Sequence, residues 1–361
     1  MTERPLAPAV TARIGGTGRY LPSKSVDNFE LYARDDVRAA FDIERARTSL
    51  RHVEDAADLA PEDVFDRWVR QVTGIEARRV LDPARTGLTT EHMCAEAGKA
   101  ALAAAGLSAQ DLDLLYVASL TCSDSVPNGA CTVANLLGVP RLGGYAFNAA
   151  CAGFVYGLAS GWAAIASGMA ERVLVISGDT LTTIVDYSDL NTAVVFGDGA
   201  GAAVLTAADG ERGFLGKPTM YGEFDREPLY LVGQGWETEG EPNPKLHMIG
   251  GPRILRNAIL TMAGAAERAV ASADLDWDDV DIVIPHQANL RITQGLEKHL
   301  ALARGRVIHN IGRYGNMSAS TVGVTLDEVV RGMHGPVPEP ATVVLTAIGG
   351  GYTTAAAVVR I

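Results

Sequence analysis

Cys151 is the residue of this chain best placed to act as a nucleophile. It follows YAFNAA (145–150), which predicts a strand, and it begins a run to residue 169 that predicts a helix. A thiol at a helix N-terminus lies near the positive end of the helix dipole and near unpaired N–H groups. We therefore expect a lowered pKa and a reactive thiolate. The alternative is a buried, unreactive cysteine, the commoner state of a cysteine in a core.

Two further polar residues could complete a catalytic set. His286 ends the apolar run VDIVIP (280–285), and strand ends in α/β sheets deliver residues to ligand crevices. Asn316 lies in a glycine-containing turn before a predicted helix. Each has a structural alternative, since a histidine can be satisfied in a core and an asparagine can simply cap a helix. Taken together, Cys, His and Asn suit acyl transfer followed by stabilisation of an enolate.

The glycine-rich runs do not predict a nucleotide site. GGTG (15–18) lacks the G-x-G-x-x-G spacing, and we expect it to end a strand in a turn. GDGAG (197–201) leads into a strand rather than a helix. The run GGG (349–351) either brings backbone N–H groups close to a ligand or forms a plain turn. With no P-loop and no pair of histidines at ligand spacing, we expect neither a cofactor nor a metal.

Composition limits the partners and the compartment. The 361 residues include 31 Lys and Arg against 43 Asp and Glu, a net charge of −12 that argues against nucleic-acid binding. The four cysteines form no C-x-x-C pair, and the N-terminus has no apolar segment of the signal-peptide kind, so we expect a cytoplasmic protein. The uncharged run 143–170 is broken by glycines and polar residues, so it predicts a strand and a buried helix rather than a membrane span.

The elements that must position these residues alternate along the chain. Short β-rich runs alternate with alanine-rich helical patterns, which predicts an α/β protein. We expect strands at 112–118, 145–149, 172–177, 202–206, 280–285, 306–310, 341–346 and 355–361. The element order repeats, which suggests two halves, 1–208 with the cysteine and 209–361 with the histidine and asparagine. A charged helical excursion, about 31–67, is either a solvated surface or a lid or partner surface.

Five motifs resemble those of the β-ketoacyl-acyl-carrier-protein synthase III family. They follow in order over nearly the whole chain: NAACAGF (148–154), FGDGAGAA (196–203), PHQANLR (285–291), GNMSAS (315–320) and GGGY (349–352). The resemblance implies an α/β, thiolase-like fold, with two similar halves in a five-layer αβαβα arrangement and the active site at their junction.

The resemblance also implies roles for the three polar residues. Cys151 corresponds to the nucleophile that accepts the acyl group. His286 and Asn316 correspond to the pair that binds the malonyl thioester carbonyl while CO2 leaves. The backbone N–H groups of Cys151 and Gly350 correspond to the oxyanion hole. Among substrate contacts, Asn289 corresponds to a residue near the pantetheine arm.

The resemblance places other substrate contacts at the rim and in the acyl pocket. Arg291 and Lys298 would belong to a basic rim that meets phosphates or an acidic carrier protein. Trp68 would belong to the segment that grips coenzyme A, and Val126, just before a proline, would form a wall of the acyl pocket, often across a dimer interface.

Three departures from the family pattern point to a relative from specialised metabolism. The segment WVRQVTGI (68–75) has Val72 where the family has arginine, with Arg70 displaced by two positions. The helical excursion is longer than the family's. The position of Val126 is often aromatic in housekeeping members, so we expect a medium, branched or aromatic acyl starter in preference to acetyl.

The expected reaction is a decarboxylative Claisen condensation through an acyl-cysteine. The donor would be an acyl-CoA or acyl-carrier protein and the acceptor malonyl-carrier protein, with the enzyme a homodimer that needs no cofactor, nucleic acid or membrane. One alternative is an acyltransferase of the same fold that passes the acyl group to an alcohol or amine. Another is a non-catalytic partner subunit, against which the intact Cys151, His286 and Asn316 argue.

Overall fold

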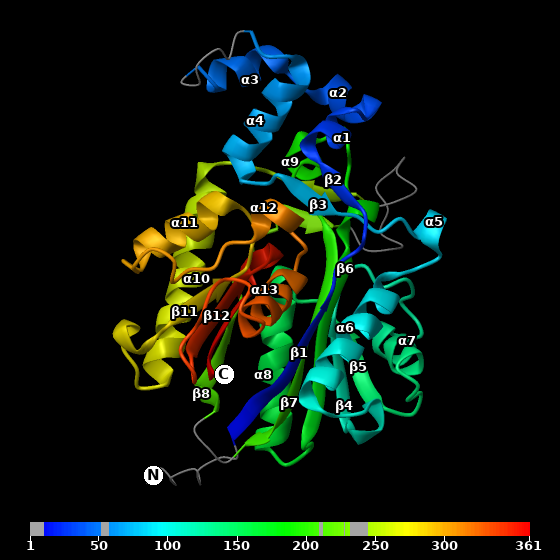
Figure 1. The fold of residues 1–361 in the computed structure, drawn as a ribbon, viewed down its shortest axis with the longest axis vertical. Helices are drawn as coiled ribbons and strands as arrows, with labels where there is room; N and C mark the ends of the chain where they lie inside the picture. The colour runs from blue at the N-terminus through cyan, green and yellow to red at the C-terminus, as the bar shows by residue number, and fades with distance from the viewer. Residues whose placement is uncertain (1–10, 52–57, 209–211, 227, 232–244) are drawn as a thin grey trace.

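Two β-sheets form the centre of the molecule (Figure 1). The computed structural model describes residues 11–51, 58–208, 212–226, 228–231 and 245–361. The first sheet has the strand order β1-β7-β6-β4-β5 and the second the order β11-β12-β13-β8. Their bounds are β1 Thr11–Tyr20, β4 Leu114–Ala118, β5 Gly143–Phe147, β6 Arg172–Thr180, β7 Asp198–Ala208, β8 Gly213–Tyr221, β11 Ile282–Pro285, β12 Thr342–Ile348 and β13 Thr354–Arg360.

Helices cover both sheets and fill the space between them (Figure 1). The outer face of the first sheet packs against α6 (Thr90–Ala105), with α7 (Gly129–Leu136) beside it. The middle layer is α8 (Gly153–Ala166) and α13 (Ser320–Val330), each of which contacts strands of both sheets. The outer face of the second sheet packs against α10 (Pro252–Ser272), with α11 (Leu290–His299) beside it. The layer order is therefore αβαβα.

The middle layer explains the long uncharged run in the sequence. Residues 143–170 contain β5 and then α8, as expected. Phe154, Val155 and Leu158 on α8 have no exposed surface, because a helix between two sheets is covered on more than one face. Within the described residues, no helix is long and apolar enough to cross a membrane.

The glycines of β1 are not in a turn, so that prediction is wrong. The strand continues through them to Tyr20, with a register shift between Ile14 and Gly16. A Cβ on Gly16 would lie 2.5 Å from the Ala101 carbonyl oxygen of α6, and one on Gly18 would meet the helix as closely. The glycines are there so that the helix can lie directly on the strand.

The charged excursion is helical, as expected, and lies apart from the layers at the top of Figure 1. It spans α1 (Asn28–Tyr32), α2 (Asp35–Ala40), α3 (Ile43–Ser49) and α4 (Pro61–Thr73). These helices pack through an aromatic cluster of Tyr32, Phe41, Phe65 and Trp68.

The predicted strand at 306–310 is wrong. This segment makes only one isolated bridge, between Val307 and Val283 of β11. Gln287 donates its side-chain amide to the Ile308 carbonyl at 2.9 Å, and its side-chain oxygen accepts the Asn310 N–H at 3.2 Å. A glutamine side chain thus takes backbone bonds that a neighbouring strand would otherwise make.

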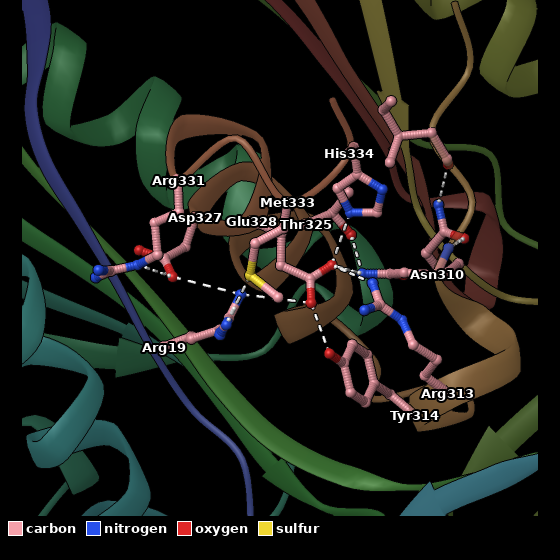
Figure 2. A network of polar contacts seen from close by, with 12 residues as sticks. Arg19, Asn310, Arg313, Tyr314, Thr325, Asp327, Glu328, Arg331, Met333 and His334 are labelled. Carbon is pink, nitrogen blue, oxygen red and sulfur yellow. Dashed lines mark hydrogen bonds and ion pairs between the residues drawn. The ribbon is translucent and has the colours of Figure 1, made fainter. Parts of the chain in front are cut away.

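A buried carboxylate at the C-terminal end of α13 organises a polar network (Figure 2). The Glu328 side chain is fully buried. It accepts hydrogen bonds from Asn310 Nδ2 (2.9 Å), Arg313 (3.0 Å), Tyr314 Oη (2.6 Å) and His334 Nε2 (2.8 Å). Burial alone would raise its pKa, but these partners lower the pKa of Glu328 to about 2.

We expect the substitution Glu328→Gln to destabilise the protein by about 3 kcal/mol, because removing one member of a buried charged network leaves its partners unpaired. The folded-state pKa is below the unfolded value of about 4.3. The stabilisation is therefore complete above that value and is lost as the pH falls toward about 2. Chemical unfolding of parent and variant at pH 7 and pH 3.5 should show the difference shrinking at the lower pH.

Glu96→Gln is the matched control for this measurement. Glu96 is a helical glutamate that pairs with an exposed lysine, Lys99, at 2.7 Å. An exposed pair of this kind contributes at most about 1 kcal/mol. A Glu328→Gln effect no larger than that of the control, or one that does not depend on pH, would contradict the role given to this network.

Candidate active site

Cys151 lies at the junction between β5 of the first sheet and α8 of the middle layer. β5 ends at Phe147, and a single helical turn, Ala150–Ala152, leads directly into α8. Ala150 has a φ of 46°, a left-handed conformation that places the cysteine at a sharp bend. The side-chain oxygen of Asn148 accepts the Ala150 N–H at 2.8 Å and holds this bend.

The expected lowering of the Cys151 pKa is wrong. Burial raises the pKa of the thiol to about 12, while a contact with the Ser318 hydroxyl lowers it in part, and the charge of Asp179 raises it further. The residue is 6 % exposed, so the loss of water disfavours the thiolate more than the helix end favours it. The thiol therefore keeps its proton in the free protein, and acylation needs a group to take it.

His286 follows β11 and is held as a neutral imidazole. Its backbone N–H donates to the Thr346 carbonyl of β12 at 2.8 Å. Burial lowers the pKa of the ring to about 3. Nδ1 lies 2.7 Å from the Thr321 hydroxyl of α13. The single proton of that hydroxyl can go either to Nδ1 or to the Ser318 carbonyl, which lies at 3.0 Å. Nδ1 therefore accepts a hydrogen bond in the first case and donates one in the second, so Thr321 determines which ring nitrogen carries the proton.

Asn316 is fixed so that its amide nitrogen stays available. Its backbone N–H donates to the Val195 carbonyl at 2.9 Å, and its backbone carbonyl accepts the Gly197 N–H at 3.0 Å. Its Oδ1 accepts the Ser318 N–H at 2.9 Å, which assigns the other side-chain atom as Nδ2. No hydrogen-bond partner for Nδ2 is found in the described part of the chain, so this donor can serve a ligand.

The end of β12 comes into contact with the turn that carries Cys151. A Cβ on Gly349 would lie 2.7 Å from the Cys151 nitrogen, so only glycine allows this approach. Gly350 follows in a helical turn of its own, Gly350–Tyr352. The first N–H groups of a helical turn have no acceptor within it. Cys151 and Gly350 lie in two such turns, and both residues line the same cavity.

Three neighbouring cavities meet around these residues. The central cavity, of about 200 Å³, is lined by Cys151, His286, Asn316, Asn289 and Gly350, among others. The large cavity, of about 850 Å³, shares with it Cys151, Phe196, Leu229 and Gly350. The outer cavity, of about 750 Å³, shares with it Val195, Met248, Gly250, Gly251, Leu255 and Asn289. The thiol therefore lies between the central and the large cavity.

Comparison with known proteins gives a family for this arrangement. Residues 145–220 match the model of 3-oxoacyl-[acyl-carrier-protein] synthase III, and residues 270–361 match the model of its C-terminal part. The chain is 35% identical over 356 residues to the β-ketoacyl-[acyl-carrier-protein] synthase III of Desulfitobacterium hafniense strain Y51, covering 97% of this chain and 98% of the relative. The chain belongs to the β-ketoacyl-[acyl-carrier-protein] synthase III family.

Solved structures of synthase III enzymes share the fold. That of the Aquifex aeolicus enzyme superposes with a TM-score of 0.81 at 32% identity, covering 97% of this chain and all of the other. The priming β-ketosynthase of the R1128 polyketide pathway superposes with a TM-score of 0.82 at 27% identity, covering 100% and 99%. The expected α/β, thiolase-like fold is thereby confirmed.

The outer cavity contains several of the expected substrate contacts of a synthase III. Trp68 and Arg291 line it, together with Val72. Arg70, two positions earlier, does not line it and instead pairs with Asp66 at 2.8 Å and Glu76 at 3.0 Å. The displaced arginine is thus engaged elsewhere, inside its own helical region.

Asn289 and Arg291 also make hydrogen bonds that connect α11 to α4. Asn289 caps α11 by accepting the Arg291 N–H at 2.9 Å, and its Nδ2 donates to the Val72 carbonyl at the same distance. The Arg291 guanidinium donates to the Gln71 carbonyl at 2.8 Å. Both residues therefore tie the excursion to the second half. Lys298 is exposed on α11 and lines none of the three cavities.

Val126 does not line any of the three cavities of its own chain. Its side chain is 89% exposed, although the neighbouring Ser125 lines the large cavity. A role as an acyl-pocket wall therefore requires a second copy of the chain, and it stays a prediction.

Sequence reasoning did not identify Thr321 or Arg45, which the structure places at the histidine ring and at the outer cavity. Thr321 sets the protonation of the histidine ring from α13, and its place directly after the GNMSAS motif was the only signal in the sequence. Arg45 of the excursion lines the outer cavity, as Arg291 does. Nothing in the sequence around Arg45 distinguishes it from other surface arginines, so this contact needed the fold.

Proposed function

We propose that this chain condenses an acyl starter with malonyl-carrier protein, with loss of CO2, through an acyl group carried on Cys151. The observation that carries the proposal is that Cys151, His286 and Asn316, from three separate segments, line one small cavity between two larger ones. Membership of the synthase III family supports the same reaction class.

In the first half-reaction the thioester of the donor would enter beside Cys151. Attack by Sγ on its carbonyl carbon produces a tetrahedral oxyanion. The N–H groups of Cys151 and Gly350, brought together by the close approach at Gly349, are suited to bind that oxygen. The acyl chain would occupy the large cavity, whose lining includes Leu120, Leu181, Ile184, Leu231 and Leu246.

In the second half-reaction the malonyl thioester carbonyl would lie between His286 and Asn316. Loss of CO2 puts negative charge on that oxygen, which two hydrogen-bond donors stabilise. Asn316 supplies Nδ2. His286 supplies Nε2–H when the Thr321 hydroxyl donates to Nδ1, the nearer of its two acceptors at 2.7 Å. Decarboxylation provides its own carbanion, so no strong base is needed.

A single incubation separates this function from its alternatives. The purified chain is mixed with acyl-CoA donors and malonyl-carrier protein, and CO2 and the carrier-bound product are measured. Release of CO2 with a lengthened β-ketoacyl product supports condensation. Acyl transfer to an added alcohol or amine without CO2 would indicate the acyltransferase, and no turnover of either kind would indicate a non-catalytic subunit.

The proposal includes a homodimer in the cytoplasm. Within one copy the Val126 side chain is 89% exposed, so the acyl-pocket role expected for it requires a partner copy. Sedimentation of the purified chain measures the oligomeric state directly, and a monomer would remove Val126 from the acyl pocket.

We expect Val126→Phe to shift the preference toward shorter acyl donors. Val leaves space that a Phe would fill, and each buried methylene contributes about 0.8 kcal/mol, or roughly a fourfold change in affinity. Competition among acyl-CoAs of increasing size should show the parent preferring medium, branched or aromatic starters over acetyl. The variant should favour acetyl more strongly than the parent does.

Val330→Phe is the matched control for this competition. Val330 is 50% exposed at the end of α13 and lines none of the three cavities, so its substitution should not change the ranking. If acetyl is preferred by the parent, or Val126→Phe leaves the ranking as it is, the pocket argument is wrong.

A further inference from the structure

Two buried polar atoms close to Cys151 have no hydrogen-bond partner in the part of the chain that the structure describes. They are the hydroxyl oxygen of Ser318 and Oδ2 of Asp179. Nearly all buried polar atoms in proteins are paired, so an unpaired one needs an explanation. The acyl chemistry described above uses neither of them.

The Asp179 carboxylate is held by one oxygen only. It lies near the end of β6 and is 1% exposed. Oδ1 accepts hydrogen bonds from Ser119 Oγ (3.1 Å), the Leu120 N–H (2.8 Å) and Thr121 Oγ1 (3.0 Å). These donors all bind the same oxygen, and within the described residues Oδ2 has no partner, so it is free to accept a proton or a hydrogen bond.

Ser318 is near both this carboxylate and the thiol. It lines the large cavity together with Cys151, and its φ of 52° is left-handed. Its hydroxyl is close enough to the Cys151 thiol and to the Asp179 carboxyl to lower the pKa of each. The segment that carries Ser318 is attached to the end of β6 through the neighbouring strand. The Ser320 hydroxyl donates to the carbonyl of Gly199, and Gly199 is paired with Asp179 in the sheet.

We propose that Ser318 and Asp179 form a proton relay for Cys151, an inference that rests on the acyl-Cys151 chemistry proposed above. As the bond forms between Sγ and the acyl carbon, the thiol proton passes to Ser318 Oγ, and Ser318 gives its own proton to Oδ2 of Asp179. The departing thiolate of the donor takes a proton from water. When condensation breaks the C–S bond, the proton returns to Sγ by the same route.

Charge balance favours this route over proton transfer to His286. The buried cluster carries one negative charge before and after the transfer, since the carboxylate becomes neutral as the thiol loses its proton. Transfer to His286 would instead create a buried cation, and burial already lowers the pKa of that ring to about 3. Burial raises the pKa of Asp179 to about 6, which makes it a better proton acceptor than an ordinary carboxylate.

Other titratable groups interact with the charge of Asp179, and their titration must be distinguished from that of Asp179 in a pH profile. Cys94 of α6 and Cys122 have pKa values raised by burial, the latter to about 11, so both stay protonated near neutral pH. Burial also raises the pKa of Asp198, on β7, to about 7. Its carboxylate accepts the Leu81 N–H and the Thr182 hydroxyl and has no part in the relay.

The test is the pH dependence of self-acylation by acyl-CoA, followed by intact-protein mass between pH 5 and 8. In the parent the rate should rise with pH through an inflection near the pKa of Asp179, about 6, because only the ionised carboxylate can accept the proton. Asp179→Asn and Ser318→Gly should lose that inflection and acylate about 100-fold more slowly at neutral pH, the scale of general-base catalysis. Ser318→Gly removes the hydroxyl and also suits the left-handed backbone.

Two controls separate the relay from a structural role. Ser320→Ala removes a neighbouring buried hydroxyl that bonds only to a backbone carbonyl, and Asp198→Asn removes the other titrating carboxylate; both should keep the inflection. Acylation of Cys151 in the parent, with the inflection and rate retained in folded Asp179→Asn or Ser318→Gly, would overturn the relay and leave the acyl-Cys151 proposal standing. A parent that does not acylate at all would overturn both.

Discussion

Replacing His286 or Asn316 by alanine should suppress malonyl decarboxylation by about 10²–10³-fold while leaving most of the self-acylation. Each residue would supply one hydrogen bond to the oxygen that becomes an enolate, and losing one such preorganised donor has an effect of this size in acyl-transfer enzymes. Neither residue contributes to the pair of N–H groups beside Cys151. The two half-reactions should therefore respond differently to the same substitution.

The two rates are measured separately, as CO2 release from malonyl-carrier protein and as mass gain from acyl-CoA. His309→Ala is the matched control, since that histidine bonds to Thr293 at 2.8 Å and lines none of the three cavities. Variants that decarboxylate at the parent rate would show that the condensing mechanism is wrong for this chain. The proton relay of Ser318 and Asp179 predicts the opposite pattern, with acylation lost far more than decarboxylation.

Cys151→Ala should abolish the acyl adduct completely. The other cysteines make this a specific test, because Cys122 also lines the large cavity and Cys131 is exposed. Brief exposure to acyl-CoA should add one acyl group to the parent and to Cys122→Ala, and none to Cys151→Ala. An adduct that maps to Cys94, Cys122 or Cys131, or that persists in Cys151→Ala, would remove Cys151 from its assigned role.

The sequence was sufficient for the elements that carry the three polar residues. Cys151 at a strand-to-helix junction and His286 after an apolar strand are local features, and the structure has both. Asp179 carries the same signal, because this polar residue ends the apolar run RVLVISG (172–178). The position of a polar residue at a strand end could therefore have suggested this carboxylate.

Other properties depend on contacts between distant segments and could not be predicted locally. The helix end predicted a low pKa for Cys151, but burial raises that pKa, and the charge of Asp179 raises it further. The glycines of β1 looked like a turn, because nothing nearby showed that α6 would lie against them. Thr321 contacts a histidine 35 positions earlier in the chain. Each of these features exists only once the two sheets and the middle layer have assembled.

The most direct test of the account is a single-turnover chase. The parent is first loaded with one acyl group from acyl-CoA, freed of excess donor, and then mixed with malonyl-carrier protein while protein mass, CO2 and carrier-bound product are followed together. The account predicts that the adduct on Cys151 disappears at the rate at which CO2 and a β-ketoacyl product longer by two carbons appear. An adduct that stays on the protein while CO2 is released, or that leaves without any lengthened product, would contradict it.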